Sequence, residues 1–173
     1  MVSAEAALET VWAWLGEIED PEIPVISILD LGIVRDVAWS GAGGDRALRV
    51  ALTPTYSGCP AIAEIERAIL ATLHANGVEQ VVLERRLFPS WTTDWLTDSG
   101  REKLRAYGIS PPQTRAVDPH APIDLTSVLE ERAACPRCGS ARVELVSRFG
   151  STPCKAHYRC TSCREPFDHF KTH

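Results

Sequence analysis

The chain has 173 residues, of which 45% are hydrophobic and 24% charged, as in soluble globular proteins. This length suits one ordinary domain, or one domain of about 100 residues with a small appendage. No run approaches the ~18 consecutive apolar residues of a membrane helix, and the N-terminus lacks the basic-then-apolar pattern of a signal peptide. We therefore expect a cytoplasmic protein that does not bind a membrane.

The net charge of −5 is unevenly distributed along the chain. Residues 1–134 carry 11 Lys and Arg against 20 Asp and Glu, a balance of −9, whereas residues 135–173 carry 7 against 3, a balance of +4. The acidic body argues against nucleic acid as a partner, because phosphate backbones attract cationic surfaces. The basic tail permits contact with an acidic partner, or with the body itself.

The first half of the chain predicts five elements in the order α-β-β-α-β. A helix is expected over residues 4–18, with Ser3 as its N-cap, because apolar residues recur there at helical spacing. DPEIPVISILDLGIV, residues 20–34, is expected to be a rigid loop that leads into the first strand. Strands over 33–39 and 47–52 are expected to form a hairpin through the turn SGAGGD.

The second helix is the strongest helical pattern in the chain, over residues 60–76. Pro60 suits its first position and Asn76-Gly77 its end. A third strand is expected over 78–88. Together these elements predict an α+β fold: a small α-β-β-α-β domain in which two helices cover one face of a mixed three-stranded sheet.

Beyond residue 89 a further helix is expected to end at Tyr107, with Thr93 or Asp94 as its cap. Residues 111–132 contain several prolines and little periodicity, which indicates a linker. We therefore predict an α/β domain over residues 1–110, a linker over 111–132 and a separate cysteine-rich module over 133–173.

That module carries two Cys-x-x-Cys turns, CPRC and CTSC. Four thiolates from two such turns make the tetrahedral site that structural zinc prefers, and so short a segment needs a metal to fold. Iron in a rubredoxin-like site is the alternative, but nothing here demands redox chemistry. We predict a zinc ribbon held by four ligands: Cys135, Cys138, Cys160 and Cys163. Cys154 is a further cysteine whose role the sequence leaves open.

Cys59 stands alone in the main domain, within TYSGCPAI. At a helix N-cap, the helix dipole and unpaired N–H groups favour a thiolate, and Gly58 lets a ligand approach closely. The alternative is a buried cysteine that only packs. A cysteine hydrolase is disfavoured, because the only histidine of the main domain, His74, lies at the far end of the same helix.

Two stretches, DPEIPVISILDLGIV and LTPTYSGCPAI, resemble iron–sulfur cluster assembly factors, the family that includes SufT and its eukaryotic cytosolic counterparts. The shared motifs are an Asp-Pro-Glu-Ile-Pro-like loop, a Thr-Pro strand end and a Cys-Pro at a helix start. The resemblance implies that Cys59 is the functional thiol. It implies a supporting loop made by Asp20, Glu22, Thr53, Gly58 and Pro60.

WTTDWLTDSGREKLRAYGISPP and the cysteine-rich tail closely resemble the PaaD family of the bacterial phenylacetate pathway. This resemblance implies a role with the multicomponent phenylacetyl-CoA oxygenase of aromatic compound degradation. That system has a di-iron catalytic subunit and a reductase that carries an iron–sulfur cluster and a flavin. Proteins of this family are thought to mature such metal centres without turning over substrate.

We therefore expect that the protein is not an enzyme but a maturation factor for the iron–sulfur or di-iron centres of the oxygenase. The expected partners are the oxygenase and reductase components. Its expected cofactors are a structural zinc and a transient iron ion or iron–sulfur cluster on Cys59. One thiol is too few to hold a cluster, so a homodimer or a partner's ligands would have to complete the site. Two alternatives stay open: a non-catalytic structural subunit of the oxygenase, and a nucleic-acid-binding ribbon protein.

Overall fold

The computed structural model describes residues 6–41, 46–56, 58–112 and 133–171. Internal contacts divide the chain into two compact units, one of residues 1–91 and 95–100 and one of residues 92–94 and 101–173. Most of the expected linker, residues 113–132, lies outside the described part. No helix among the described residues is long and apolar enough to cross a membrane.

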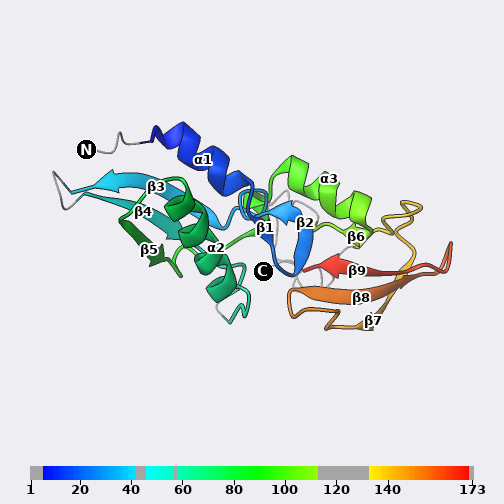
Figure 1. Ribbon diagram of the computed structural model, residues 1–173. Helices are drawn as coiled ribbons and strands as arrows, with labels where there is room; N and C mark the ends of the chain where they lie inside the picture. Colours follow the sequence, from blue (N-terminus) through cyan, green and yellow to red (C-terminus); the bar gives the residue numbers. More distant parts are fainter. Residues whose placement is uncertain (1–5, 42–45, 57, 113–132, 172–173) are drawn as a thin grey trace, which may run out of the picture. The chain divides into compact units, whose positions relative to one another are not determined.

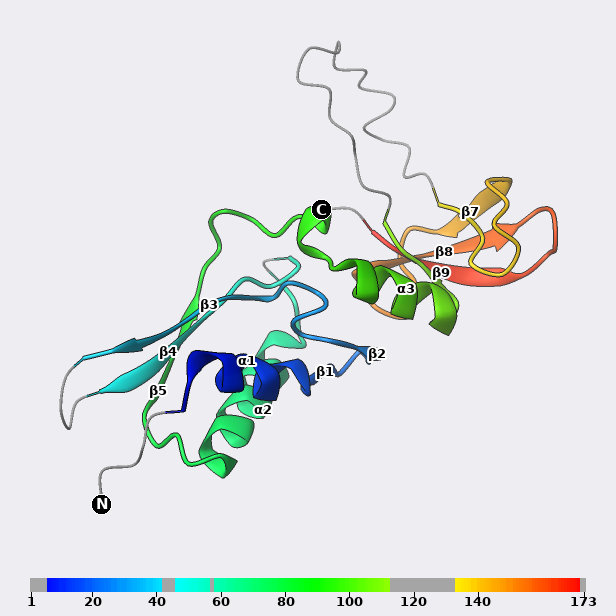
Figure 2. The ribbon, with the colours of Figure 1, turned by 90° about the horizontal axis from the view of Figure 1, so that it is seen from above.

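The first unit confirms the predicted α-β-β-α-β domain with a mixed three-stranded sheet (Figures 1 and 2). In the sheet order β3-β4-β5, β3 runs antiparallel to β4 and β5 parallel to it. Helix α1 contacts both β3 and α2, and α2 contacts β5. The five elements are α1 (Leu8–Gly16), β3 (Val34–Ser40), β4 (Ala47–Leu52), α2 (Ile62–Ala75) and β5 (Val81–Arg85).

Element ends differ from the predicted ones by a few residues. Helix α1 begins at Leu8 rather than at residue 4, with Ala7 as its N-cap, and the predicted cap Ser3 lies outside the described residues. Helix α2 begins at Ile62 with Ala61 as its N-cap, so Pro60 precedes the helix instead of opening it. The chain then turns at Gly77, whose φ of +84° suits a helix C-terminus.

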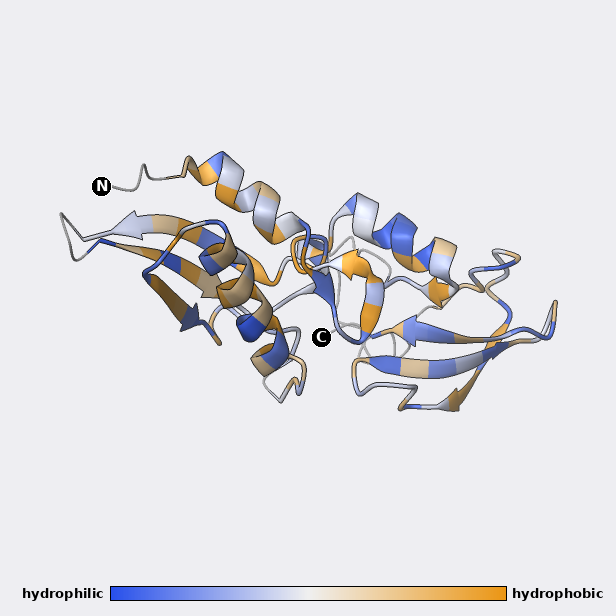
Figure 3. Ribbon diagram, viewed as in Figure 1, coloured by the Kyte–Doolittle hydropathy of each residue, from blue (hydrophilic) through white to orange (hydrophobic). Residues whose placement is uncertain are grey.

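The core of this unit lies between the helices and the sheet. From α2 it receives Ile65, Ile69 and Leu73, which recur every four residues and are at most 1% exposed. Each fully buried aliphatic side chain of this kind contributes about 1.5–3 kcal/mol of transfer free energy. Figure 3 shows hydrophobic and hydrophilic residues interspersed along α2, as a helix with one buried face requires. In β4 the buried Leu48 follows the half-buried Ala47, and the last three residues, Val50 to Leu52, are all buried.

Residues 19–27 form a small hairpin where a loop was expected. Strand β1 (Glu19–Asp20) pairs antiparallel with β2 (Ile23–Ser27). The Asp20 side chain makes the turn, because its Oδ1 accepts the backbone N–H groups of Glu22 and Ile23, both at 2.9 Å. Asp20 is buried, with 7% of its surface exposed, and its carboxylate stabilises this turn.

The segment after β5 packs against the loop that follows β2. Trp91 Nε1 donates to the Leu31 carbonyl at 2.7 Å, and Thr97 N donates to the Asp30 carbonyl at 2.9 Å. Thr97 Oγ1 accepts the Gly100 N–H at 2.9 Å and therefore caps helix α3 (Asp98–Tyr107). The predicted caps, Thr93 and Asp94, lie instead in a short 3₁₀ helix, Thr93–Trp95.

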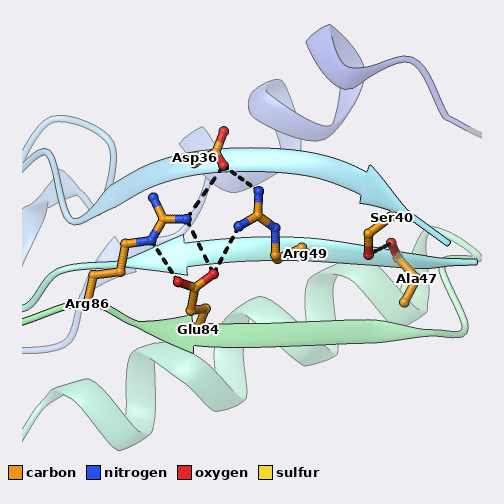
Figure 4. A network of polar contacts seen from close by, with 6 residues as sticks. All are labelled: Asp36, Ser40, Ala47, Arg49, Glu84 and Arg86. Atoms are coloured by element: carbon orange, nitrogen blue, oxygen red, sulfur yellow. Dashed lines mark hydrogen bonds and ion pairs between the residues drawn. The ribbon is translucent and has the colours of Figure 1, made fainter.

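The sheet face turned away from α2 carries a network of ion pairs (Figure 4). Arg49 joins Asp36 at 2.9 Å to Glu84 at 3.0 Å, and Arg86 donates to Glu84 at 2.9 Å. Three of these side chains come from β3, β4 and β5, and Arg86 directly follows β5; each is about a third or more exposed. The network therefore pairs opposite charges on a solvent-exposed surface and adds little stability.

The second unit is a four-stranded sheet of order β6-β9-β8-β7. Its core is small, with Tyr158, Phe167 and Cys160 as the main buried members. Tyr158 and Phe167 stack with ring centroids 5.9 Å apart. The strands are β6 (Ile109–Ser110), β7 (Val143–Ser147), β8 (Lys155–Cys160) and β9 (Pro166–Phe170).

The second unit begins before the predicted boundary at residue 110, because strand β6 belongs to its sheet. Ile109 pairs in parallel with Asp168, and Ser110 with His169. Residues 101–112 therefore group with the cysteine-rich module. The sequence did not predict this grouping, because it depends on backbone pairing with residues almost 60 positions away, and a two-residue strand has no recognisable sequence pattern.

Candidate functional site

Cys59 lies in the connection between β4 and α2. Thr53, at the end of β4, is 2% exposed and donates its N–H to the Ile33 carbonyl at 2.8 Å, which anchors the start of this connection. Cys59 N donates to the Tyr56 carbonyl at 3.2 Å, and the Cys59 carbonyl accepts from Ile62 N at 3.4 Å. The thiol is half-buried, so a partner or reagent can reach it.

Cys59 is not the N-cap of α2, because Ala61 occupies that position. Burial raises the pKa of the Cys59 thiol, and the carboxylates of Glu22 and Asp20 raise it further. The backbone N–H groups of Ala61 and Ile62 act in the opposite direction but do not compensate. At neutral pH Cys59 is therefore a protonated thiol.

Only some of the predicted supporting residues act on Cys59. Asp20 and Glu22 act electrostatically on Cys59 from the β1–β2 turn, although that turn is 37 residues or more away along the chain. Gly58 and Pro60 are exposed, and a Cβ on Gly58 would meet only the Tyr56 ring, at 3.5 Å. Asp30, the next carboxylate along the chain, accepts hydrogen bonds from the side chains of Ser27 and Thr97.

The four predicted zinc ligands converge. Among the described residues, Cys135, Cys138, Cys160 and Cys163 form the only cluster of three or more metal-type ligands, with all four Sγ atoms within 4.8 Å of one another. Two of the separations are 3.7 Å, from Cys135 to Cys163, and 3.6 Å, from Cys138 to Cys160. A tetrahedral zinc with bonds of ~2.3 Å requires sulfur separations of about 3.8 Å, so the cluster fits this ion.

The electrostatics of the cluster also favour a bound cation. The Cys163 N–H, followed by that of Ser162, lowers the pKa of Cys160 to about 6. Although the Glu165 N–H acts to lower it, burial and the neighbouring sulfurs raise the pKa of Cys163 to about 12. Four thiolates cannot share this space without a compensating positive charge, and a divalent metal supplies it.

Cys154 lies apart from this cluster. Its side chain is buried, 5% exposed, and its Sγ is 3.0 Å from Thr152 Oγ1. The same unit contains a polar pair that the sequence could not predict: His157 Nδ1 is 3.0 Å from Asp168 Oδ1. These two residues are adjacent only because of the β8–β9 register, which sets them opposite each other.

Two family models match the chain. The iron–sulfur cluster assembly protein model matches residues 8–82, and the PaaD zinc beta ribbon domain model matches residues 119–171. The first range contains Cys59 with Asp20 and Glu22, and the second contains the four-cysteine cluster.

A curated relative from Escherichia coli K12 is named as the D component of a "Putative 1,2-phenylacetyl-CoA epoxidase". It is 48% identical over 168 residues, which cover 97% of this chain and 94% of the relative.

Three solved structures are similar to part of the chain. A DUF59 domain from Bacillus anthracis is 24% identical, covers 56% of this chain and 89% of its own, and has a TM-score of 0.49. A conserved hypothetical protein from Thermotoga maritima is 25% identical, with coverages of 60% and 98% and a TM-score of 0.48. A Mycobacterium tuberculosis protein described as associated with Fe-S complex assembly and repair is 28% identical, with coverages of 62% and 94% and a TM-score of 0.38.

The near-full-length identity to the curated relative carries the assignment, and the two matched models cover both halves of the chain. The chain belongs to the PaaD family of 1,2-phenylacetyl-CoA epoxidase components, in which an iron–sulfur cluster assembly domain is joined to a zinc ribbon.

Proposed function

We propose that the chain is a non-catalytic maturation factor that delivers iron or an iron–sulfur cluster to the phenylacetyl-CoA oxygenase. The observation that carries this proposal is the half-exposed Cys59 thiol beside the carboxylates of Asp20 and Glu22, in the part that matches the iron–sulfur assembly family. We place the protein in the cytoplasm, where the oxygenase and reductase components would be its partners.

The carboxylates suit a thiol that binds its cargo transiently. They raise the pKa of Cys59, so the thiol stays protonated until a cation arrives, and their negative charge attracts that cation. As the sulfur–iron bond forms, the thiol proton leaves to water. On delivery, a ligand of the acceptor forms a bond to iron, the Cys59–iron bond breaks, and the sulfur regains a proton from water.

Cys59 alone cannot hold a cluster, because no other cysteine of the first unit accompanies it. Ligands from the acceptor, or Cys59 of a second copy, would complete the coordination. The zinc ribbon, with its small core, serves as a folded docking module and takes no part in the transfer.

The test compares the wild-type protein with Cys59→Ser, and with Cys154→Ser as a matched control. Each variant is purified anaerobically for metal analysis and is co-expressed with the oxygenase components, whose iron content is measured. We expect Cys59→Ser to keep its zinc and its fold but to lower the iron content of the partner. Full partner metallation with Cys59→Ser would refute the proposal.

The second candidate is a structural subunit of the oxygenase, which the name of the curated relative favours. It predicts a stable stoichiometric complex with the assembled oxygenase. In that case Cys59→Ser would weaken the complex or the fold and leave the iron content of the partner unchanged.

A further inference from the structure

A pocket of about 430 Å³ lies in the second unit, between helix α3 and the first Cys-x-x-Cys turn. This volume is within the range of small-molecule sites. The described residues that line it all belong to the second unit. The lining residues are two arginines of α3, Ser110–Pro112, Ala134–Pro136 and Gly139.

The two arginines bring positive charge to the pocket, and Cys135, a ligand of the metal cluster, is the only described wall residue that carries negative charge. Arg101 is fixed by the carbonyls of Pro112, at 2.5 Å, and Thr93, at 2.6 Å. Both partners are uncharged, so the guanidinium keeps its full charge. Arg105 lies one turn further along the helix and is exposed, and its side chain makes no hydrogen bond or ion pair with the described residues. No Asp or Glu is among the described residues that line the pocket.

The remaining wall is mostly apolar. Pro111, Pro112, Ala134 and Pro136 offer no side-chain donor or acceptor. The Ser110 hydroxyl is already engaged, because its Oγ accepts from Ala134 N at 3.3 Å and is 3.2 Å from His169 Nδ1. A fitting ligand therefore has an acidic group for the arginines and an apolar part for the prolines.

We propose that this pocket binds a small organic anion, whose carboxylate or phosphate group is held by Arg101 and Arg105. Guanidinium groups bind both kinds of oxyanion through paired, charge-assisted hydrogen bonds. The site is separate from Cys59 and does not depend on the maturation role.

The test uses the zinc-loaded full chain and follows backbone amide resonances by NMR during titration at constant ionic strength. Phenyl phosphate and benzoate represent the two acidic groups, and inorganic phosphate lacks the apolar part. We expect saturable shifts of the Ser110 and Gly139 amides, with at least one aromatic anion binding more tightly than inorganic phosphate. Whichever aromatic anion binds more tightly identifies the acidic group of the natural ligand.

Arg105→Gln is expected to weaken binding by about ten-fold, the effect of one lost charge-assisted hydrogen bond. Because Arg105 is exposed, this change should leave the fold intact. Arg159→Gln, at an exposed arginine of the same unit outside the pocket, is the matched control and should bind as the wild type does. Shifts that do not saturate, or an equal loss in both variants, would overturn the proposal. Cys59→Ser should bind these anions normally, which separates this result from the test of maturation.

Discussion

Gly32 is in direct contact with the backbone of Trp95. A Cβ built on Gly32 would lie 2.4 Å from the Trp95 carbonyl oxygen and 2.8 Å from its Cβ, and the φ of Gly32 is +67°. The guanidinium of Arg35 stacks on the Trp95 ring at 3.5 Å from its centroid. This contact fastens the segment after β5 to the loop that ends at β3.

Gly32→Ala should therefore destabilise the first unit strongly. The left-handed backbone and the clash together should cost about 3 kcal/mol, because the neighbouring atom belongs to the backbone and cannot rotate away. Gly77→Ala is the matched control, since Gly77 has a φ of +84° but open space around its Cβ position, and it should cost only about 1 kcal/mol. Urea unfolding followed by tryptophan fluorescence measures both changes, and equal effects would contradict the close contact.

Asp20 should be replaceable by asparagine but not by alanine. Its Oδ1 accepts two backbone N–H groups in the β1–β2 turn. Asp20→Ala would leave both donors without this acceptor, at a cost of about 2 kcal/mol, whereas Asp20→Asn keeps an oxygen in place. Thermal unfolding of the two variants distinguishes these outcomes, and a fully stable Asp20→Ala would show that the turn does not need the side chain.

The rate at which Cys59 reacts with an alkylating reagent should increase with pH, and the midpoint of this increase should lie at a higher pH than for an unstructured cysteine. Burial and the charges of Glu22 and Asp20 raise its pKa, so the thiolate forms only as the pH passes above the ordinary cysteine range. Iodoacetamide labelling across a pH series, read by mass spectrometry at Cys59, gives the midpoint.

Glu22→Gln should shift that midpoint downward, because it removes one of the two negative charges. At a fixed pH below the midpoint, the variant should therefore react faster than the wild type. A midpoint at or below that of a free cysteine peptide would show that the helix N-terminus dominates after all.

Removal of zinc should unfold the second unit selectively. Its core is small, so the metal must contribute much of its folding free energy. A chelator, or Cys160→Ser, should abolish amide protection across β7–β9 in hydrogen exchange and leave α2 and β4 protected. Cys154→Ser alters a buried cysteine outside the cluster and should retain a full complement of zinc. Retention of β8 protection in the metal-free protein would contradict this account.

Local patterns were enough to predict most of the first unit and the metal cluster. The apolar stripe of α2 reflects its one buried face, so its spacing can be seen in the sequence. The Cys-x-x-Cys turns are likewise local, and four thiolates have few other uses in a short segment. Their convergence within 4.8 Å follows the expected pairing of the two turns.

Other features were decided by contacts between distant parts of the chain. The protonation of Cys59 depends on burial and on two carboxylates from a turn far away in sequence, which outweigh the local influence of the helix start. The pairing of Ile109 with Asp168 joins the residues after α3 to the second unit, and the cap of α3 is Thr97, whose N–H is bound by the distant Asp30 carbonyl. The sequence by itself determined which segments become helices, strands and metal turns, because those depend on spacing along the chain. Only the tertiary structure decided the charge of the thiol and the partners of each loop, because desolvation and long-range pairing depend on what surrounds a residue.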